Sequence, residues 1–368
     1  MKLICNGNDL ADAVGKVFKA ISARSNNPIL EGIKINAESG TLTLTATDLE
    51  LAIEKVIVAD VKIEGETVVP GRFFSEFVKK LTKEEIELVV SDKSQVKIKY
   101  TDSEGVLQCF DSADYPEIKE LSSAQSFVVK SEDLRDLVNK IAFSVSADDA
   151  RPILKGVLLE IGADSVTGVA LDGYRLARSV KPIIKTTGEM SAIVPARCLT
   201  EIARLLDNHD DEVSVSIQKN YLMVNLGHTK ITSRLLDGNF LNYRQIIPSS
   251  FNTEVTLPKE RFESGLERAK LLARADKNNL VRFDIKENYM QLSSNCETGN
   301  IVEKIVIRMD GQDLAIAFNA RYYMELLRYV DTETVTIKFT DQVSPCVVVP
   351  SDGKDDFMYL VLPVRLLD

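Results

Sequence analysis

The sequence predicts an α+β fold of three similar domains, each with two helices packed on antiparallel sheets. Three observations support this fold class. The segment NPILEGI, which contains Pro28, returns as RPILKGV around Pro152, 124 positions later. Helix-like and strand-like hydrophobic periods alternate along the chain. The chain of 368 residues is also longer than a domain with a single hydrophobic core usually is, so several domains are expected.

A second repeated segment places an arginine in register in all three predicted domains. TVVPGRFFSEFV contains Arg72, AIVPARCLTEIA contains Arg197, and IAFNARYYMELL contains Arg321. Each predicted domain also opens with a short strand followed by an amphipathic helix. Because short polar segments separate these repeats, we expect domains at residues 1–121, 122–250 and 251–368.

Six helices are expected, two in each domain. Asn8 and Ser131 each stand where a helical period begins, and both are expected to be N-caps. Alternating stretches such as residues 41–58 and 95–100 predict antiparallel strands with one buried face. A hydrophobic period of about 3.6 residues predicts the helices at 10–24, 71–82, 132–146, 196–207, 259–274 and 320–330.

The charge of the chain is unevenly distributed. The formal net charge is −10, yet the six predicted helices sum to about +6, which leaves about −16 on the remaining residues. One interpretation is that helix surfaces simply favour Lys and Arg. The other is that all six helices lie on one face and offer a mildly positive lining to a polyanion through weak, salt-sensitive phosphate contacts.

No catalytic or metal-binding motif is recognised. The two histidines, His209 and His228, lack a second His or Cys at ligand spacing. The acidic pairs at residues 148–149 and 355–356 lie in polar stretches that are typical of turns. We therefore expect a protein that is not an enzyme and has no cofactor and no metal. A metal-dependent hydrolase that uses the Asp pairs is the alternative.

The cysteines indicate a reducing compartment. All five stand singly, without a Cys-x-x-Cys pair, as is typical of buried thiols. The first apolar run ends after Cys5, and no run approaches the roughly 18 residues that span a bilayer. A cytoplasmic location is expected.

Three domains per chain can form a ring wide enough to enclose a DNA duplex only if two chains combine. A domain of about 120 residues is roughly 35 Å across. Three touching spheres of that size leave a hole of about 5 Å, and six leave about 35 Å. A DNA duplex is about 20 Å wide. Two chains joined head to tail could therefore encircle a duplex, since successive similar domains supply the heterologous contacts that a ring needs.

Eight segments in order give the chain a family likeness. They are NPILEGI, TLTLTATDLE, TVVPGRFF, RPILKGVLLE, ALDGYRLA, IVPARCL, SRLLDGNFLNYRQIIP and LVLPVRL. Over essentially its whole length the chain resembles the bacterial DNA polymerase III beta subunit, the DNA sliding clamp family. The resemblance implies the DNA clamp fold in a head-to-tail dimeric ring. It also implies a non-catalytic processivity factor that encircles duplex DNA and tethers the replicative polymerase.

The same resemblance implies partners and contact residues. The partners are double-stranded DNA, bound without sequence specificity, the DNA polymerase III catalytic subunit, an ATP-dependent clamp loader, and other polymerases and repair proteins with clamp-binding peptides. Dimer contacts are implied for Leu107, Leu271 and Leu272, although the last two could instead pack inside their own domain. DNA contacts are implied for Arg24, Arg72, Arg197, Asp148, Pro152 and Ile153.

A hydrophobic peptide-binding cleft is implied between the second and third domains. Leucines and a tyrosine would form its apolar floor, and Arg175 and Arg365 could bind a carbonyl or carboxylate of the peptide. Without the resemblance, the same final strand could be ordinary core, and a protein-binding scaffold that never encircles DNA is the alternative function. The implied cleft residues are Leu154, Leu171, Gly173, Tyr174, Arg175, Leu176, Leu241, Ile246, Leu360, Leu362, Pro363, Val364, Arg365 and Leu366.

Overall fold

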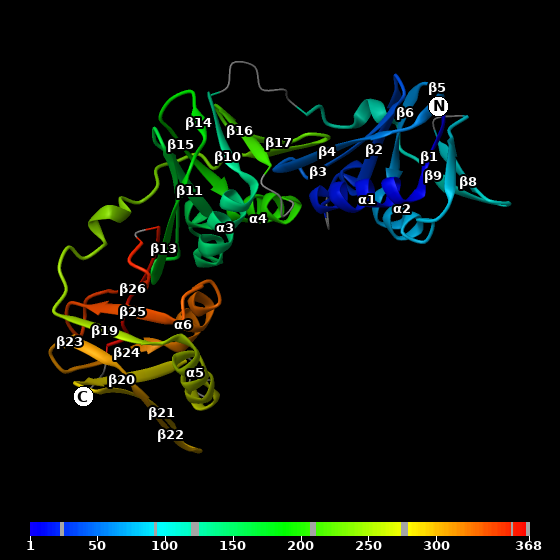
Figure 1. The fold of residues 1–368 in the computed structure, drawn as a ribbon. Helices are drawn as coiled ribbons and strands as arrows, with labels where there is room; N and C mark the ends of the chain where they lie inside the picture. Colours follow the sequence, from blue (N-terminus) through cyan, green and yellow to red (C-terminus); the bar gives the residue numbers. More distant parts are fainter. Residues whose placement is uncertain are drawn as a thin grey trace. The chain divides into compact units, whose positions relative to one another are not determined.

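The computed structural model describes residues 1–22, 26–91, 94–118, 125–206, 211–273, 279–354 and 356–365 (Figure 1). These residues form two compact units. Unit 1 comprises Met1–Glu132, Ile184–Gly188 and Arg197–Leu235. Unit 2 comprises Asp133–Ile183, Glu189–Ala196 and Leu236–Asp368.

Unit 1 contains two antiparallel sheets. The smaller has the strand order β5-β1-β7-β8-β9, and the larger has the order β14-β10-β16-β17-β18-β4-β3-β2-β6. The strands of the smaller sheet are β1 (Lys2–Asn6), β5 (Asp60–Ile63), β7 (Glu85–Val89), β8 (Gln95–Tyr100) and β9 (Ser103–Gln108). Those of the larger sheet are β2 (Gly32–Glu38), β3 (Thr41–Thr47), β4 (Leu51–Val58), β6 (Gly65–Pro70), β10 (Gln125–Lys130), β14 (Lys185–Thr186), β16 (Glu212–Gln218), β17 (Tyr221–Leu226) and β18 (Thr229–Arg234).

Unit 2 also contains two antiparallel sheets. The larger has the order β15-β11-β12-β13-β27-β26-β25-β19-β23, and the smaller has the order β22-β21-β20-β24. The strands of the larger sheet are β11 (Gly156–Ile161), β12 (Ser165–Leu171), β13 (Arg175–Pro182), β15 (Met190–Pro195), β19 (Thr253–Pro258), β23 (Arg308–Gly311), β25 (Thr334–Phe339), β26 (Cys346–Pro350) and β27 (Phe357–Val361). Those of the smaller sheet are β20 (Leu280–Lys286), β21 (Tyr289–Cys296), β22 (Gly299–Val306) and β24 (Leu314–Asn319).

Six α-helices occur in the part of the chain that the structure describes, as the sequence predicts, although several end earlier than expected. In unit 1, α1 packs against α2 and β4, and in unit 2, α5 packs against α6, β21 and β22 (Figure 1). None of these helices is long and apolar enough to cross a membrane. Their bounds are α1 (Gly7–Val17), α2 (Gly71–Val78), α3 (Ser131–Ile141), α4 (Ala196–Leu205), α5 (Lys259–Ala273) and α6 (Ala320–Leu327).

The start of α1 corrects one prediction. Asn6, and not Asn8, is the N-cap, because its Oδ1 accepts the N–H groups of Asn8 at 2.9 Å and Asp9 at 3.2 Å. Asn8 therefore lies inside the first turn. At the other end, the helix continues only as a short 3₁₀ turn, Phe18–Ala20, so it is shorter than the predicted range 10–24.

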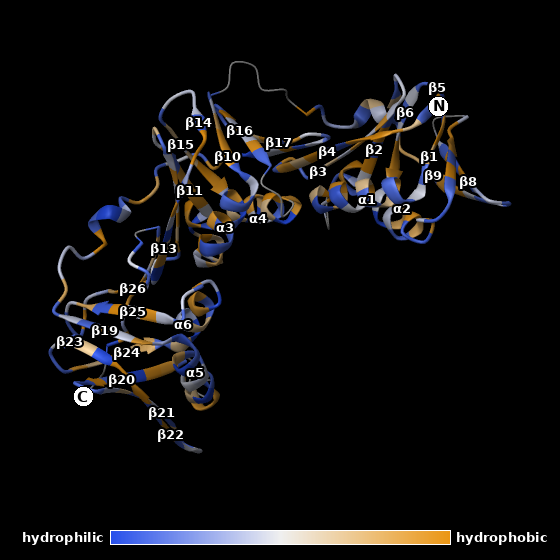
Figure 2. Cartoon of the chain, viewed as in Figure 1, coloured by the Kyte–Doolittle hydropathy of each residue, from blue (hydrophilic) through white to orange (hydrophobic). Residues whose placement is uncertain are grey.

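The strands follow the expected alternation. At the start of β3, Leu42 and Leu44 are fully buried while Thr41 and Thr43, which alternate with them, are half-buried, as a strand with one core face requires. Figure 2 shows apolar residues along the strands of each sheet, whereas the turn that joins β8 to β9 is hydrophilic. The cores of both units thus lie along their sheets.

Each nine-stranded sheet joins strands from two successive repeats. In unit 1, β18 pairs with β4, and in unit 2, β13 pairs with β27. The compact units therefore do not coincide with single repeats. Residue 121, at the first predicted domain boundary, lies outside the described residues.

Candidate functional site

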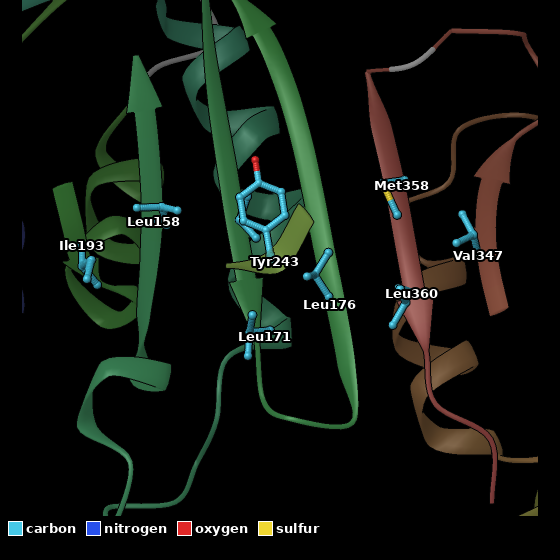
Figure 3. Close-up of a cluster of buried hydrophobic side chains, with 9 residues drawn as sticks. Leu158, Leu171, Leu176, Ile193, Tyr243, Val347, Met358 and Leu360 are labelled. Atoms are coloured by element: carbon cyan, nitrogen blue, oxygen red, sulfur yellow. The ribbon is translucent and has the colours of Figure 1, made fainter. Parts of the chain in front are cut away.

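An apolar cluster in unit 2 brings together side chains from both repeats that share the larger sheet (Figure 3). Leu176 on β13 lies opposite Leu360 on β27, so the pairing of these strands places both leucines on one face. Leu171 joins them, and all three are buried. Three predicted cleft residues thus lie in one cluster, whose buried members are Leu158, Val169, Leu171, Leu176, Ile193, Tyr243, Val347, Met358 and Leu360.

Five apolar side chains with accessible surface are together called the rim. Leu154 and Ile246 are half-buried and pack against the cluster, whereas Tyr174, Leu241 and Leu362 each lie two residues away in sequence from one of its buried members. Tyr174 and Leu241 expose 62% and 53% of their surface. Because the buried leucines below are covered, a ligand approaching this surface would meet the rim residues first.

The β12–β13 turn shapes part of the rim. The Oδ1 atom of Asp172 accepts the N–H groups of Tyr174 at 2.8 Å and Arg175 at 3.0 Å. Gly173, which stands between Asp172 and Tyr174, has φ +96°, in the left-handed region where glycine meets no steric penalty. The carbonyl of Tyr174 then accepts the N–H of Leu362 at 2.8 Å, which ties the turn to the C-terminal segment.

The C-terminal segment is fixed on its other side as well. The N–H of Val364 donates to the carbonyl of Ala317 on β24 at 2.8 Å. Leu362 and Pro363 are half-buried, and Arg365 is exposed. Of these predicted cleft residues, Leu362 lies beside Tyr174, and Leu366 lies outside the described residues.

Arg175 is a correction to the predicted site. Neighbouring residues of a strand point to opposite faces, so Arg175 lies on the face away from Leu176 and the cluster. Its side chain is only 7% exposed, and its guanidinium bonds to Asp172, Glu325 and Tyr359 within the chain. With its donors engaged there, Arg175 is not placed to bind the carbonyl or carboxylate of a peptide at the rim.

The surroundings of Arg175 keep it charged. Burial by itself lowers the pKa of its guanidinium, but Tyr359 and Glu325 have the larger combined effect, so the pKa lies above its ordinary value. Burial also raises the pKa of the Glu325 carboxyl, but hydrogen bonds from Arg321 and Arg175 bring it below its ordinary range. The pair is therefore ionised at neutral pH.

The structure adds residues that the sequence reasoning did not assign to the cleft. Tyr243 is buried in the cluster, and its hydroxyl donates to Oε2 of Glu160 at 2.8 Å. Burial, followed by that hydrogen bond, raises the pKa of Tyr243 to about 12. Met358 and Val347 flank Leu360 in the cluster. The available signal was the spacing of Met358 from Leu360, since every second residue of a strand shares a face; the uniformly apolar segments 357–361 and 346–350 do not show by themselves which face is which.

The predicted DNA contacts occupy different environments. Arg72 lies in the first turn of α2, and its side chain is 88% exposed beside Glu76. Arg197 lies at the equivalent place in α4 but donates to Oδ2 of Asp48 at 2.5 Å. Arg24 lies outside the described residues. Of the two described arginines, Arg72 is thus the more accessible to a phosphate.

The loop before β11 divides the other three predicted DNA contacts. Asp148 is exposed and caps its own turn by accepting the N–H of Ala150 at 2.9 Å. Pro152 is exposed as well. Ile153 is half-buried and packs against the apolar cluster, close to Gly238. Ile153 therefore belongs to the cluster, and its prediction as a DNA contact is not supported by its position.

The predicted dimer residues lie on one sheet edge and one helix. Leu107 is half-buried on β9, the edge strand of the five-stranded sheet, next to exposed Val106. Leu271 near the end of α5 is 64% exposed, so it does not pack inside its own domain. Leu272 is half-buried. α5 packs on β22, the edge strand of the four-stranded sheet, where Val302 is exposed. Each unit thus carries an apolar sheet edge.

The acidic pairs form no metal centre among the described residues, where no group of three or more His, Cys, Asp or Glu side chains converges. Asp149 forms an ion pair with Lys155. His209 and Asp355 lie outside the described residues.

Comparison with known proteins gives consistent matches along the whole chain. The family models of the DNA polymerase III beta subunit match in sequence order: the N-terminal domain at residues 1–119, the central domain at 128–242 and the C-terminal domain at 244–365. The beta sliding clamp of Bacillus subtilis is 30% identical over 378 residues, covering 99% of this chain and 100% of the relative. That of Halalkalibacterium halodurans is 31% identical over 379 residues, with 99% and 100% covered.

Solved structures give the same result. The DNA polymerase sliding clamp from Bacillus subtilis has a TM-score of 0.96 at 29% identity, covering 100% of both chains. The DNA polymerase III beta subunit from Thermotoga maritima has a TM-score of 0.93 at 28% identity, again covering 100% of both chains.

Proposed function

The chain belongs to the DNA polymerase III beta subunit family, the bacterial sliding clamps, and from this premise we propose that two copies close head to tail into a ring around duplex DNA. It has the three-domain clamp fold and is a non-catalytic processivity factor whose partners are DNA and the polymerase. The observation that carries this conclusion is the ordered match of all three family domains. The repeats at 1–121, 122–250 and 251–368 are the proposed domains of the ring.

The two apolar sheet edges support the head-to-tail contact. β9 in unit 1 and β22 in unit 2 each offer unpaired strand edges with exposed valines, Val106 and Val302. A heterologous contact needs two different surfaces on each chain, one for each neighbour. We propose that β9, with Leu107, meets β22 and the end of α5, with Leu271 and Leu272, in a second copy.

The rim of the apolar cluster is the proposed peptide site. Exposed Tyr174 and Leu241, with half-buried Leu154, Ile246 and Leu362, offer apolar contact beside the C-terminal segment. The ligands would be short apolar peptides from the polymerase, from an ATP-dependent clamp loader, and from other polymerases and repair proteins. We propose that the protein acts in the bacterial cytoplasm, where these partners work on the chromosome.

DNA contact is proposed to be electrostatic and weak. Arg72 is exposed, whereas Arg197 would first have to leave Asp48. A small number of arginine–phosphate contacts gives salt-sensitive binding without base reading, which suits a protein that slides.

The native mass tests the ring. Light scattering at low micromolar concentration should give about twice the chain mass of 40.9 kDa, unchanged on dilution. Given a clamp loader, the protein should then be retained on nicked circular DNA and released when the circle is linearised. A stable monomer that is not retained on circles would contradict the ring and favour a scaffold that does not encircle DNA.

A further inference from the structure

Arg175 joins four segments of unit 2 through one buried guanidinium. Its Nε donates to Oδ2 of Asp172 at 2.9 Å, and its Nη2 donates to the carbonyl of Phe143 at 2.8 Å. Its Nη1 bonds to Glu325 on α6 and lies 3.3 Å from the hydroxyl of Tyr359 on β27. A planar guanidinium that satisfies several partners fixes their relative positions, since its donors form a rigid fork.

The same guanidinium controls the turn beside the cleft. The carboxylate of Asp172 is held between two backbone N–H groups on one oxygen and Arg175 on the other. Tyr174 stands within this turn, and its carbonyl holds Leu362. The position of both rim residues therefore depends on a contact made on the opposite face of the sheet.

On that opposite face, α6 supplies the counter-charge. Glu325 accepts from Arg175 with one carboxylate oxygen and from Arg321 at 2.7 Å with the other. The guanidinium of Arg175 lies 4.8 Å from the ring centroid of Tyr322 and 5.7 Å from that of Phe143. These contacts seat Arg175 against α6 and away from the apolar cluster.

We propose that Arg175 is a positioning residue that binds no peptide itself but ties the rim of the cleft to α6 through Glu325. This proposal rests on the proposed peptide-binding function. It predicts that a carboxylate on α6, on the face away from the cluster, sets the affinity of the cleft.

The first experiment measures peptide affinity by fluorescence anisotropy. The probe is a fluorescein-labelled synthetic peptide that carries the clamp-binding segment of a DNA polymerase III catalytic subunit. Glu325→Gln should weaken binding about five- to tenfold, because the neutral amide loses the charge-assisted bond to Arg175. Arg175→Lys, which keeps the charge but not the fork, should weaken binding by a similar factor.

The matched control is Glu333→Gln, which removes an exposed carboxylate of the same unit and should leave affinity within about twofold of wild type. If wild type itself does not bind the peptide, the proposed cleft fails. If wild type binds and Glu325→Gln binds equally well, the cleft stands and the positioning role is overturned.

A second readout separates positioning from general loss of stability. The chain contains no tryptophan, so Tyr174→Trp places a single fluorophore on the turn. In this background, Glu325→Gln should lower the steady-state anisotropy of the tryptophan at temperatures well below unfolding. An unchanged tryptophan anisotropy together with a lowered Tm would mean that the substitution acts through stability alone, and would overturn the proposal.

Discussion

Two hairpin turns, β3–β4 in unit 1 and β12–β13 in unit 2, share one backbone design and differ in what they hold. In each, an aspartate (Asp48 or Asp172) accepts the N–H groups two and three residues later at 2.8 to 3.0 Å. In each, the next residue is left-handed: Leu49 has φ +76° and Gly173 has φ +96°. The repeated sequence therefore produces the same local turn twice.

The difference lies in the arginine that the second carboxylate oxygen meets. Asp172 bonds to Arg175, three residues on and 7% exposed, which continues to Glu325. Asp48 bonds to Arg197, which comes from the next repeat and is 51% exposed, although the Asp48 side chain itself is only 8% exposed. The same turn can therefore hold an arginine that is buried or an arginine that water reaches, with a buried aspartate in both cases.

The largest expected effect is on stability. Arg175→Met should lower the free energy of unfolding by about 3 kcal/mol, because it leaves the Asp172 and Glu325 carboxylates without their buried partner. Arg197→Met should cost less, about 1–2 kcal/mol, because the guanidinium is half-exposed, although its loss leaves the buried Asp48 carboxylate with only its backbone N–H partners. Urea unfolding of both variants measures the difference, and equal losses would refute the contrast between the two turns.

Substitutions at the two left-handed positions should differ in their effect on stability. Gly173→Leu should destabilise by about 1–2 kcal/mol, since a side chain is disfavoured at this φ and its Cβ would lie 3.2 Å from Nη1 of Arg151. Leu49→Gly should change stability by less than about 1 kcal/mol, because relief of strain is offset by the greater freedom of glycine in the unfolded chain. Thermal unfolding tests both; a strongly destabilising Leu49→Gly would show that the exposed leucine has a packing role.

Acid should weaken the ion pair between Arg175 and Glu325 at the β12–β13 turn. The pKa of Glu325 is raised by burial but lowered overall by its hydrogen bonds to Arg321 and Arg175, so the unfolded chain takes up the proton first as pH falls. The stabilisation is therefore complete above the ordinary carboxyl pKa and is lost as pH falls through the lowered folded-state pKa. The stability difference between wild type and Glu325→Gln should shrink over that range in urea titrations. A difference independent of pH would exclude the ion pair as its source.

The smallest effect should come from releasing Arg197. Asp48→Asn keeps an oxygen for the turn N–H groups but removes the charge that holds the guanidinium, at a cost of about 0.5 kcal/mol or less. A freed arginine can neutralise one phosphate, so the slope of log K for linear duplex DNA against log salt should steepen by about 0.9. An unchanged slope in anisotropy titrations would mean that Arg197 does not reach DNA.

The sequence by itself determined the repeat, the six helices and the alternation of the strands. These features depend on local periods and on segments such as RPILKGV, which need no knowledge of distant partners. The eight family segments also pointed to the correct family. Leu171, Leu176 and Leu360 of the predicted cleft lie in one apolar cluster, and the motifs of the resemblance name them together.

Only the tertiary structure decided which face each residue occupies. Arg175 and Leu176 are adjacent in sequence, and β13 pairs with β27, about half the chain away. In this sheet Arg175 contacts α6, whereas Leu176 packs in the apolar cluster. Ile153 belongs in sequence to a loop predicted to touch DNA, but in the structure it packs against the apolar cluster and Gly238. The first turn of α1 likewise needed atomic geometry to show that Asn6 is its cap. Strand register and side-chain partners are long-range properties, since a shift of one residue reverses every face of a strand.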